Sequence, residues 1–297
     1  MFKEFEWNQK LYDSIEKKVN ENIINFENMD KYNIEDEKYK KFISDVEEVY
    51  LTHPDGPYKG DKKELKNDKE YISKSLIKNI QIVKYYGDVI QKAIDDANKN
   101  GGGKVIIPGG TKEEPKIYYS GSITLKSNVE LYIEENAIIK FLRNKSNRFY
   151  PLVYTRWEGV EMMNFSPFIY SYEAENIAIS GKGVLDGCAD EFNWMPWKFG
   201  YFNEEDQQIQ RERLFNLGQE NACVRTRRIF NDEISTIRPP FIQPYKSKNI
   251  LIKDITILNS PFWEVNPVLC ENIKIDSITV DSHLYNNDGV DPESCRD

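Results

Sequence analysis

The sequence predicts an all-β protein: a right-handed parallel β-helix with an N-terminal α-helical cap and extension. Short apolar alternations broken by Asn and Gly fill residues 104–187. In addition, the pattern Asn-[Val/Ile]-x-[Leu/Ile] recurs at Asn128, Asn176, Asn249 and Asn272. The last two Asn are 23 residues apart, and a repeat of this length with strand character is typical of a solenoid that forms one coil per repeat.

The other copies of the pattern are further apart. The first gap is 48 residues and the second is 73, or about two and three periods, and the second contains the irregular stretch 188–240. Asn suits the turns of such a solenoid, where stacked side-chain amides hydrogen-bond between coils. A β-sandwich is the alternative architecture, but it does not explain why Asn recurs at the same place in each repeat.

Residues 1–75 differ from the rest and are predicted to form a helical extension and linker. Apolar residues recur every four residues from Leu11 to Ile23 and again from Phe42 to Val49, which indicates two amphipathic helices. The stretch 52–70 combines turn formers with balanced charges, as in a linker or solvated loop. Residues 76–297 are then predicted to be the N-terminal part of the β-helix domain.

A further helix is predicted over residues 88–100. Asp88 is the expected cap at its start, and Gly101-Gly102-Gly103 ends it. The open end of a β-helix is an exposed sheet edge, and a helix placed just before the first strand covers that edge.

Composition excludes some classes of function. The formal net charge of −9, from 40 basic and 49 acidic residues, argues against a nucleic-acid partner held by a basic face. The 15 Phe, 18 Tyr and 5 Trp suit a protein that stacks rings against sugars, although many belong to a core. No apolar run approaches the ~20 residues of a membrane helix, and the charged start lacks the apolar segment of a secretory peptide. We therefore expect a cytoplasmic protein without a membrane span. Four cysteines lack metal-ligand spacing and are expected to be reduced: Cys188, Cys223, Cys270 and Cys295.

From about residue 82 to the last residue, a series of segments follows in a recognisable order. They read IQKAIDDANKNGGGKVIIPGG, LKSNVELYIEENAIIKF, YTRWEGVE, ENIAISGKGVLDG, RPPFIQPYKSKNILIKDITILNSPFW and NNDGVDPESC. Together they resemble glycoside hydrolase family 28, the polygalacturonase family of pectin-degrading β-helix enzymes. The resemblance implies an inverting glycosidase that acts on pectic oligo- or polysaccharide. We expect neither a cofactor nor a metal, and the oligomeric state is left open.

The family pattern combines an Asn-x-Asp segment, an Asp-Asp pair, a Gly-His-Gly and an Arg-x-Lys. Asn286-Asn287-Asp288 matches the first of these. The one Asp-Asp pair of the sequence, Asp95-Asp96, falls inside the predicted cap helix, and the other two motifs occur nowhere. The sequence is therefore expected to be the front part of such an enzyme, truncated before the second half of the active site, and this chain alone is expected to be inactive.

Hydrolysis of a glycosidic bond needs a carboxylic acid for the leaving oxygen and a carboxylate that activates water or attacks carbon. Asp288 matches the family carboxylate that orients and deprotonates the water. Asn286 matches the family Asn, which is expected to bind sugar or position the carboxylates. An ordinary turn is the alternative for this string. For Asp291, a structural hydrogen bond within the coil is favoured over a role as a site carboxylate.

Two further groups of residues are candidates for substrate contact. Arg156 can pair with a uronate and Trp157 can stack on a pyranose ring, although a packed loop explains them equally well. His53 and His283 have no metal constellation, and His283 is expected at a plain turn. Six arginines in a short stretch could receive a polyuronate, with a mixed-charge surface loop as the safer interpretation: Arg211, Arg213, Arg225, Arg227, Arg228 and Arg238.

Other functions remain open from the sequence. A rhamnogalacturonan hydrolase of the same family is the close alternative. A β-eliminating pectate lyase would need a Ca²⁺ site of several carboxylates and a basic catalytic residue. A catalytically inactive β-helix fragment that binds glycans is the remaining alternative. A cytoplasmic location would mean imported oligosaccharides, which favours exo action from chain ends.

Overall fold

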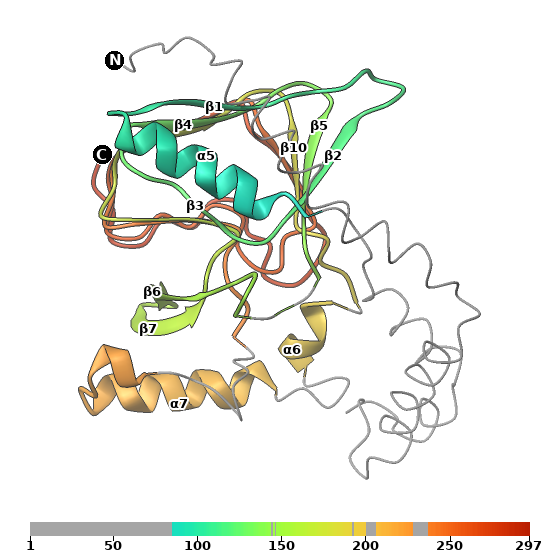
Figure 1. The fold of residues 1–297 in the computed structure, drawn as a ribbon. Helices are drawn as coiled ribbons and strands as arrows, with labels where there is room; N and C mark the ends of the chain where they lie inside the picture. Colours follow the sequence, from blue (N-terminus) through green and yellow to red (C-terminus); the bar gives the residue numbers. More distant parts are fainter. Residues whose placement is uncertain (1–84, 144, 146, 192, 200–205, 228–236) are drawn as a thin grey trace, which may run out of the picture.

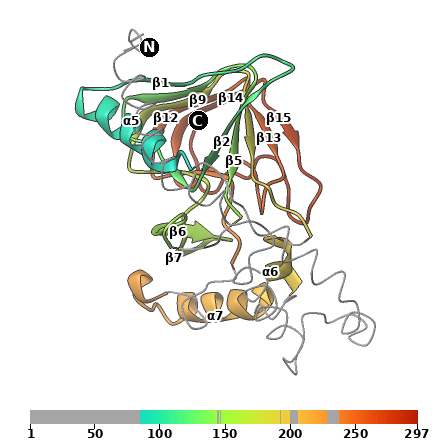
Figure 2. The ribbon, with the colours of Figure 1, turned by 45° about the vertical axis from the view of Figure 1, so that its right-hand side comes forward.

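The computed structural model describes residues 85–297 except 144, 146, 192, 200–205 and 228–236. The extension predicted for residues 1–75 lies outside the described residues. The described chain folds as a right-handed parallel β-helix of three sheets, with further elements packed on one side (Figures 1 and 2). All strand pairs within the three sheets are parallel, as the sequence predicts.

Each of the first three coils contributes one strand to each sheet, and the last two coils contribute strands to the first and second sheets. The first sheet contains β1 (Gly103–Ile107), β4 (Val129–Ile133), β9 (Glu175–Ser180), β12 (Lys248–Lys253) and β14 (Glu271–Asp276). The second sheet contains β2 (Lys116–Ser120), β5 (Ala137–Phe141), β10 (Val184–Asp186), β13 (Thr256–Leu258) and β15 (Thr279–Asp281). The third sheet contains β3 (Ile123–Thr124), β8 (Ile169–Tyr172) and β11 (Ile242–Tyr245). Isolated bridges extend the third sheet to Val265 and Val268, and then to Val290 and Glu293.

The recurrent Asn residues form one corner of the β-helix. All four adopt positive φ, between 54° and 63°, a conformation that Asn tolerates better than most residues. Each Nδ2 donates to the Oδ1 of the Asn in the preceding coil, at 2.8 Å in every step from Asn128 to Asn272. The predicted corner is confirmed. The spacing of two and three periods is wrong, because Asn176 pairs directly with both Asn128 and Asn249, and each long gap is a single coil that contains a detour.

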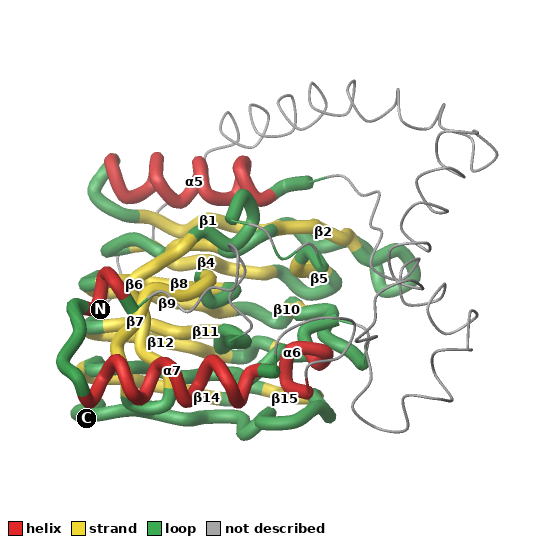
Figure 3. The backbone as a smooth tube through the Cα atoms, turned by 90° about the horizontal axis from the view of Figure 1, so that it is seen from below, coloured by secondary structure: helices red, strands yellow, loops and turns green. Residues whose placement is uncertain are grey.

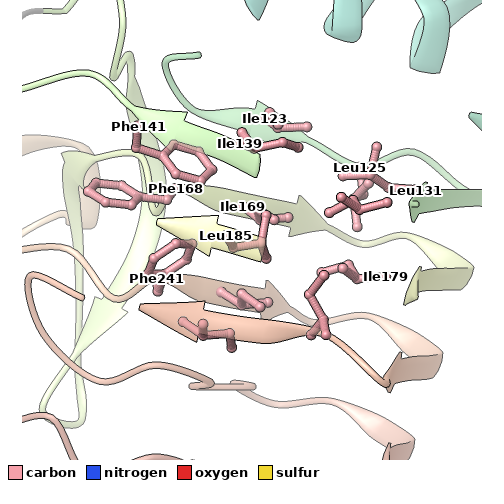
Figure 4. Packing of buried hydrophobic residues seen from close by; sticks show 14 of the residues in the cluster. Ile123, Leu125, Leu131, Ile139, Phe141, Phe168, Ile169, Ile179, Leu185 and Phe241 are labelled. Atoms are coloured by element: carbon pink, nitrogen blue, oxygen red, sulfur yellow. The ribbon is translucent and has the colours of Figure 1, made fainter. Parts of the chain in front are cut away.

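The core fills the space between the sheets. Strands β4 and β5 alternate buried and partly buried residues along their length, so that Leu131 and Ile139 point inward (Figure 4). Phe141 stacks on Phe168 at a centroid distance of 4.8 Å, and Phe241 meets both rings edge-on. Apolar burial of this kind is the main driving force that holds the coils together.

Helix α5 (Gly87–Lys99) covers the first coil, with Ile90, Ala93 and Ile94 facing the core. The predicted cap at Asp88 is wrong by two residues, since the N-cap is Tyr86 and Asp88 lies in the first turn. The backbone N–H of Tyr86 donates to the carbonyl of Tyr119 in β2 at 2.8 Å. The chain is therefore fixed to the sheet immediately before the helix begins.

Two detours leave the β-helix at the corner between the second and third sheets. The first is an antiparallel hairpin of β6 (Leu152–Trp157) and β7 (Val160–Phe165), located between β5 and β8. The second, between β10 and β11, contains α6 (Met195–Phe199), α7 (Gln207–Gln219) and the 3₁₀ helix η1 (Val224–Thr226). Both lie on the side of the third sheet (Figure 3). None of the described helices is long and apolar enough to cross a membrane.

Candidate active site

The Asn-x-Asp segment follows β15 at the same corner from which the detours leave. The side chain of Asn287 fixes it to the preceding coil, because Nδ2 donates to the carbonyls of Ser260 and Phe262 at 3.1 and 2.9 Å. Its Oδ1 accepts from the backbone N–H of Leu284 at 2.7 Å. The middle residue of the motif therefore holds its two neighbours in place.

Asp288 is exposed and stands beside the coil before it. Its Oδ2 accepts a hydrogen bond from the indole Nε1 of Trp263 at 3.0 Å. Gly289 follows with φ +60°, a conformation that favours glycine. Trp263 thus orients one carboxylate oxygen of Asp288.

Three carboxyl groups near this segment, those of Asp291, Glu264 and Glu293, have pKa values raised by burial. Burial raises the pKa of Asp291 to about 6, and the charges of Asp288 and Glu293 act in the same direction. Burial also raises the pKa of Glu264 to about 7. The side chain of Glu264 is fully buried and its Oε2 accepts from the N–H of Gly289 at 2.9 Å, so Glu264 supports the segment from below and cannot reach a sugar.

The structural hydrogen bond expected for the Asp291 carboxylate is not present among the described residues. The backbone carbonyl of Asp291 instead accepts from Asn266 Nδ2 at 2.6 Å, and its buried Oδ2 has no hydrogen-bond partner. Asn266 in turn accepts at Oδ1 from Gln243 Nε2 at 2.7 Å. The side chains of Gln243, Asn266 and Asp291 lie in a row across neighbouring coils of the third sheet. Because Asn266 bonds to the backbone of Asp291, the carboxyl group of Asp291 stays unpaired beside Asp288.

Asn286 is held by a buried arginine. The Nη2 of Arg238 donates to Asn286 Oδ1 at 2.8 Å, and its Nη1 donates to the carbonyls of Pro261 and Tyr285 at 2.8 and 2.9 Å. Its Nε donates to Gln207 Oε1 at the start of α7, at 2.9 Å. Burial lowers the pKa of Arg238 to about 9. The guanidinium group joins the second detour to the Asn-x-Asp segment.

The two substrate-contact candidates in the hairpin, Arg156 and Trp157, have different environments. The guanidinium of Arg156 lies at the surface of the site, with Nε 3.2 Å from Glu293 Oε2 and Nη1 3.2 Å from Ser294 Oγ. Trp157 is only 1% exposed, stacks on Phe262 at 5.4 Å and donates its Nε1 hydrogen to the carbonyl of Arg238. Trp157 therefore has no free face for a sugar, and its structural role is packing.

The remaining candidates lie away from Asp288 or are otherwise engaged. Arg211 pairs with Glu158 at 2.5 Å. His283 is exposed just before the turn at residues 284–286, and its Nε2 lies 2.6 Å from Asp281 Oδ1. His53 and Arg228 lie outside the described residues. Within the described ranges, no three His, Cys, Asp or Glu side chains are grouped so as to hold a metal ion.

No family model matches the chain. A solved structure of the hyperthermoactive exopolygalacturonase of Thermotoga maritima superposes with a TM-score of 0.64 and 34% identity, over 85% of this chain and 54% of that one. The chain resembles the polygalacturonases of glycoside hydrolase family 28. A probable polygalacturonase of Vitis vinifera is 24% identical over 216 residues, which are 69% of this chain and 36% of that protein. This polygalacturonase-like chain thus spans about half the length of the first relative and about a third of the second.

Sequence reasoning missed three residues of the polygalacturonase-like site. The Asn-x-Asp pattern leaves Asn287 as its variable position, no motif includes Glu264, and Arg238 falls in a stretch for which the sequence favours a surface loop. One signal was available for Glu264: it lies 25 residues before Gly289, close to the 23-residue spacing of the Asn corner. That spacing places it one coil below the motif.

Proposed function

We propose that the chain binds pectic galacturonide and takes part in the hydrolysis of its glycosidic bonds. The observation that carries this proposal is the exposed Asp288 carboxylate, oriented by Trp263 and next to the unpaired carboxyl group of Asp291. The similarity to polygalacturonases supports galacturonide as the substrate. A cytoplasmic location remains a prediction.

In this mechanism Asp288 accepts a proton from the attacking water while the glycosidic oxygen leaves with a proton from a second carboxyl group. Water forms the new bond to the anomeric carbon on the face opposite the leaving group, so the configuration inverts. Because Asp291 holds its proton more tightly than an ordinary carboxyl group, the repulsion on an ionised Asp288 is reduced below pH 6. Arg238 donates a hydrogen bond to Oδ1 of Asn286. This bond orients the Nδ2 group of Asn286 as a hydrogen-bond donor for a sugar hydroxyl.

Calorimetric titration with trigalacturonate tests the binding half of this proposal. We expect the 297-residue chain to bind trigalacturonate. Asp288→Asn should bind equally or more tightly, because the variant removes a negative charge near an anionic ligand. Asp276→Asn, which changes a carboxylate on β14, is the matched control and should bind like the original protein. A chain that binds no trigalacturonate would contradict the proposal, and preferential binding of a rhamnogalacturonan oligosaccharide would favour that substrate.

Release of reducing ends from polygalacturonate tests the catalytic half. The family's Asp-Asp pair has no counterpart at this site, so we expect the chain alone to release none. In a longer form of the protein that also contains the family's Asp-Asp pair, Asp288→Asn should lower kcat at least ~10²-fold and leave KM nearly unchanged. A near-original kcat in that variant would move the role of base to Asp291.

A further inference from the structure

An open groove of about 640 Å³ runs between the hairpin and the second detour. The hairpin contributes Arg156 and Glu161, α7 contributes Phe215, and the chain beyond η1 contributes Arg227. Leu269, which is 37% exposed, lines it from the chain between β13 and β14.

The groove is joined to the candidate active site through Arg156. This arginine lines the groove and pairs with Glu293, whose Oε2 also accepts from the backbone N–H of Gly159 in the hairpin turn at 3.1 Å. Glu293 comes two residues after Asp291, a separation of roughly 7 Å in an extended chain. A chain-like ligand seated over Asp288 and Asp291 therefore reaches the groove within a short distance.

The groove contains a cationic group, the guanidinium of Arg227, that no carboxylate of the described residues neutralises. Arg227 donates its Nε to the carbonyl of Ala222 at 2.9 Å and its Nη1 to the carbonyl of Glu161 at 3.2 Å. These acceptors are neutral, so they position the guanidinium group without cancelling its charge. In the described part of the chain, no carboxylate forms an ion pair with Arg227.

Among the described residues that line the groove, Glu161 supplies the carboxylate, and its charge is already engaged. Glu161 accepts from the hydroxyl of Tyr245 and lies 3.5 Å from Lys246 Nζ. Burial works against ionisation, but the bond from Tyr245 and the charge of Lys246 outweigh it and lower the pKa of Glu161. Its negative charge is therefore directed to Lys246, and Arg227 remains available for an anionic ligand.

We propose that this groove is a subsite for a uronic acid residue, in which the Arg227 guanidinium pairs with the sugar carboxylate. Planar guanidinium groups match carboxylates in two parallel hydrogen bonds. The half-buried ring of Phe215 already carries the Arg211 guanidinium, 4.2 Å from its centroid, so the contact with the sugar carboxylate carries the proposal. The inference rests on the proposed function, because it assigns a further sugar of the same galacturonide chain to the groove.

Calorimetric titration compares trigalacturonate with its fully methyl-esterified, uncharged form. Arg227→Gln should raise the Kd for trigalacturonate about 10-fold, since a charge-assisted hydrogen bond is lost, and change the Kd for the ester by less than about 2-fold. Lys274→Gln removes one positive charge from the outer side of β14 and is the matched control, with an unchanged Kd for both ligands. Arg227→Gln should also reduce the dependence of affinity on salt concentration.

A second variant covers the case in which Arg227→Gln fails to fold. Gln219 is exposed and lines the groove, so Gln219→Glu adds a negative charge there without disturbing the core. It should raise the Kd for trigalacturonate at least about 3-fold and leave that of the ester unchanged.

The outcomes separate this inference from the proposed function. If the original chain does not bind trigalacturonate, the proposed function fails. If the original chain binds but Arg227→Gln and Gln219→Glu bind equally well, the subsite is wrong while the function stands. Equal losses for trigalacturonate and the ester would also overturn it, because the carboxylate would then have no part in the contact.

Discussion

At the scale of single residues, Arg238 holds more of the site together through hydrogen bonds than its sequence context indicates. Its side chain is fully buried, yet it makes hydrogen bonds to Gln207 in α7, to Pro261 in the next coil and to Asn286 one coil beyond that. Hydrogen bonds that involve a charged group contribute about 1.5–3 kcal/mol each. The sequence could not place Arg238 inside the protein, because arginine is almost never fully buried unless it is paired, and its partners are 23 to 48 residues away along the chain.

Glu264 makes stability depend on pH in a defined direction. The unfolded chain loses the proton of this carboxyl group near its ordinary pKa of 4.5, and the folded protein retains it up to about pH 7. Between these values the folded state binds the additional proton, so the free energy of unfolding falls as pH rises from 4.5 to 7. We therefore expect Glu264→Gln to raise Tm by a few degrees at pH 8 and much less at pH 4.5.

Thermal unfolding followed by circular dichroism at both pH values measures this effect. Glu175→Gln, which changes an exposed glutamate on β9, is the control, and its Tm difference should be the same at both pH values. A Glu264→Gln variant that loses stability equally at pH 4.5 and pH 8 would show that the carboxylate acts as an acceptor for Gly289 and not as a buried charge.

At the scale of elements, the Asn corner stabilises the stack through both its hydrogen bonds and its backbone conformation. Asn249→Ala removes two amide hydrogen bonds and places a residue with a Cβ but no amide at φ +54°. We expect the free energy of unfolding to fall by about 1–3 kcal/mol, as measured with urea. Asn249→Gly keeps the backbone freedom and loses only the amide, so its loss should be smaller. If the two variants lose equal stability, the positive φ is not part of the effect.

The sequence identified the elements that repeat and missed those that do not. The strands between residues 104 and 187 and the Asn corner follow from alternation and recurrence, because every coil imposes the same burial on the same positions. The hairpin β6–β7 and helix α7 belong to no repeat and were not predicted. One local signal for α7 was present, since Asp206 accepts from the N–H of Gln208 as its N-cap, at 2.8 Å.

At the scale of the whole molecule, the predicted domain boundary has a direct consequence. Helix α5 already covers the first coil, and Tyr85 and Tyr86 fix the chain to β2 through Tyr119. A protein that starts at residue 76 keeps these contacts. We therefore expect removal of residues 1–75 to change Tm by less than about 3 °C, measured by calorimetry. A larger loss would show that the extension packs on the β-helix and is not a separate segment.

The site itself was predicted only in part, for a geometric reason. The motif at Asn286 and Asp288 is contiguous in sequence and could be recognised directly. Its supports come from other coils and from both detours, and the detours change the sequence distance between neighbouring coils from 23 to 73 residues. With the spacing interrupted in this way, no fixed period could show that Arg156 and Arg238 lie beside the motif.

Both detours leave the β-helix at one corner. The chain can therefore lengthen at that corner without disturbing the regular stacking of the coils. Closing a loop of 73 residues costs only about 1 kcal/mol more than closing one of 23, because the entropy cost grows with the logarithm of length. The ladders on either side are bonded from coil to coil and do not pass through the detours. Segments can therefore be lengthened, shortened or exchanged at this corner while the coils stay in register. The β-helix thus supports the hairpin and the second detour beside Asp288, and these segments can change while the β-helix stays the same.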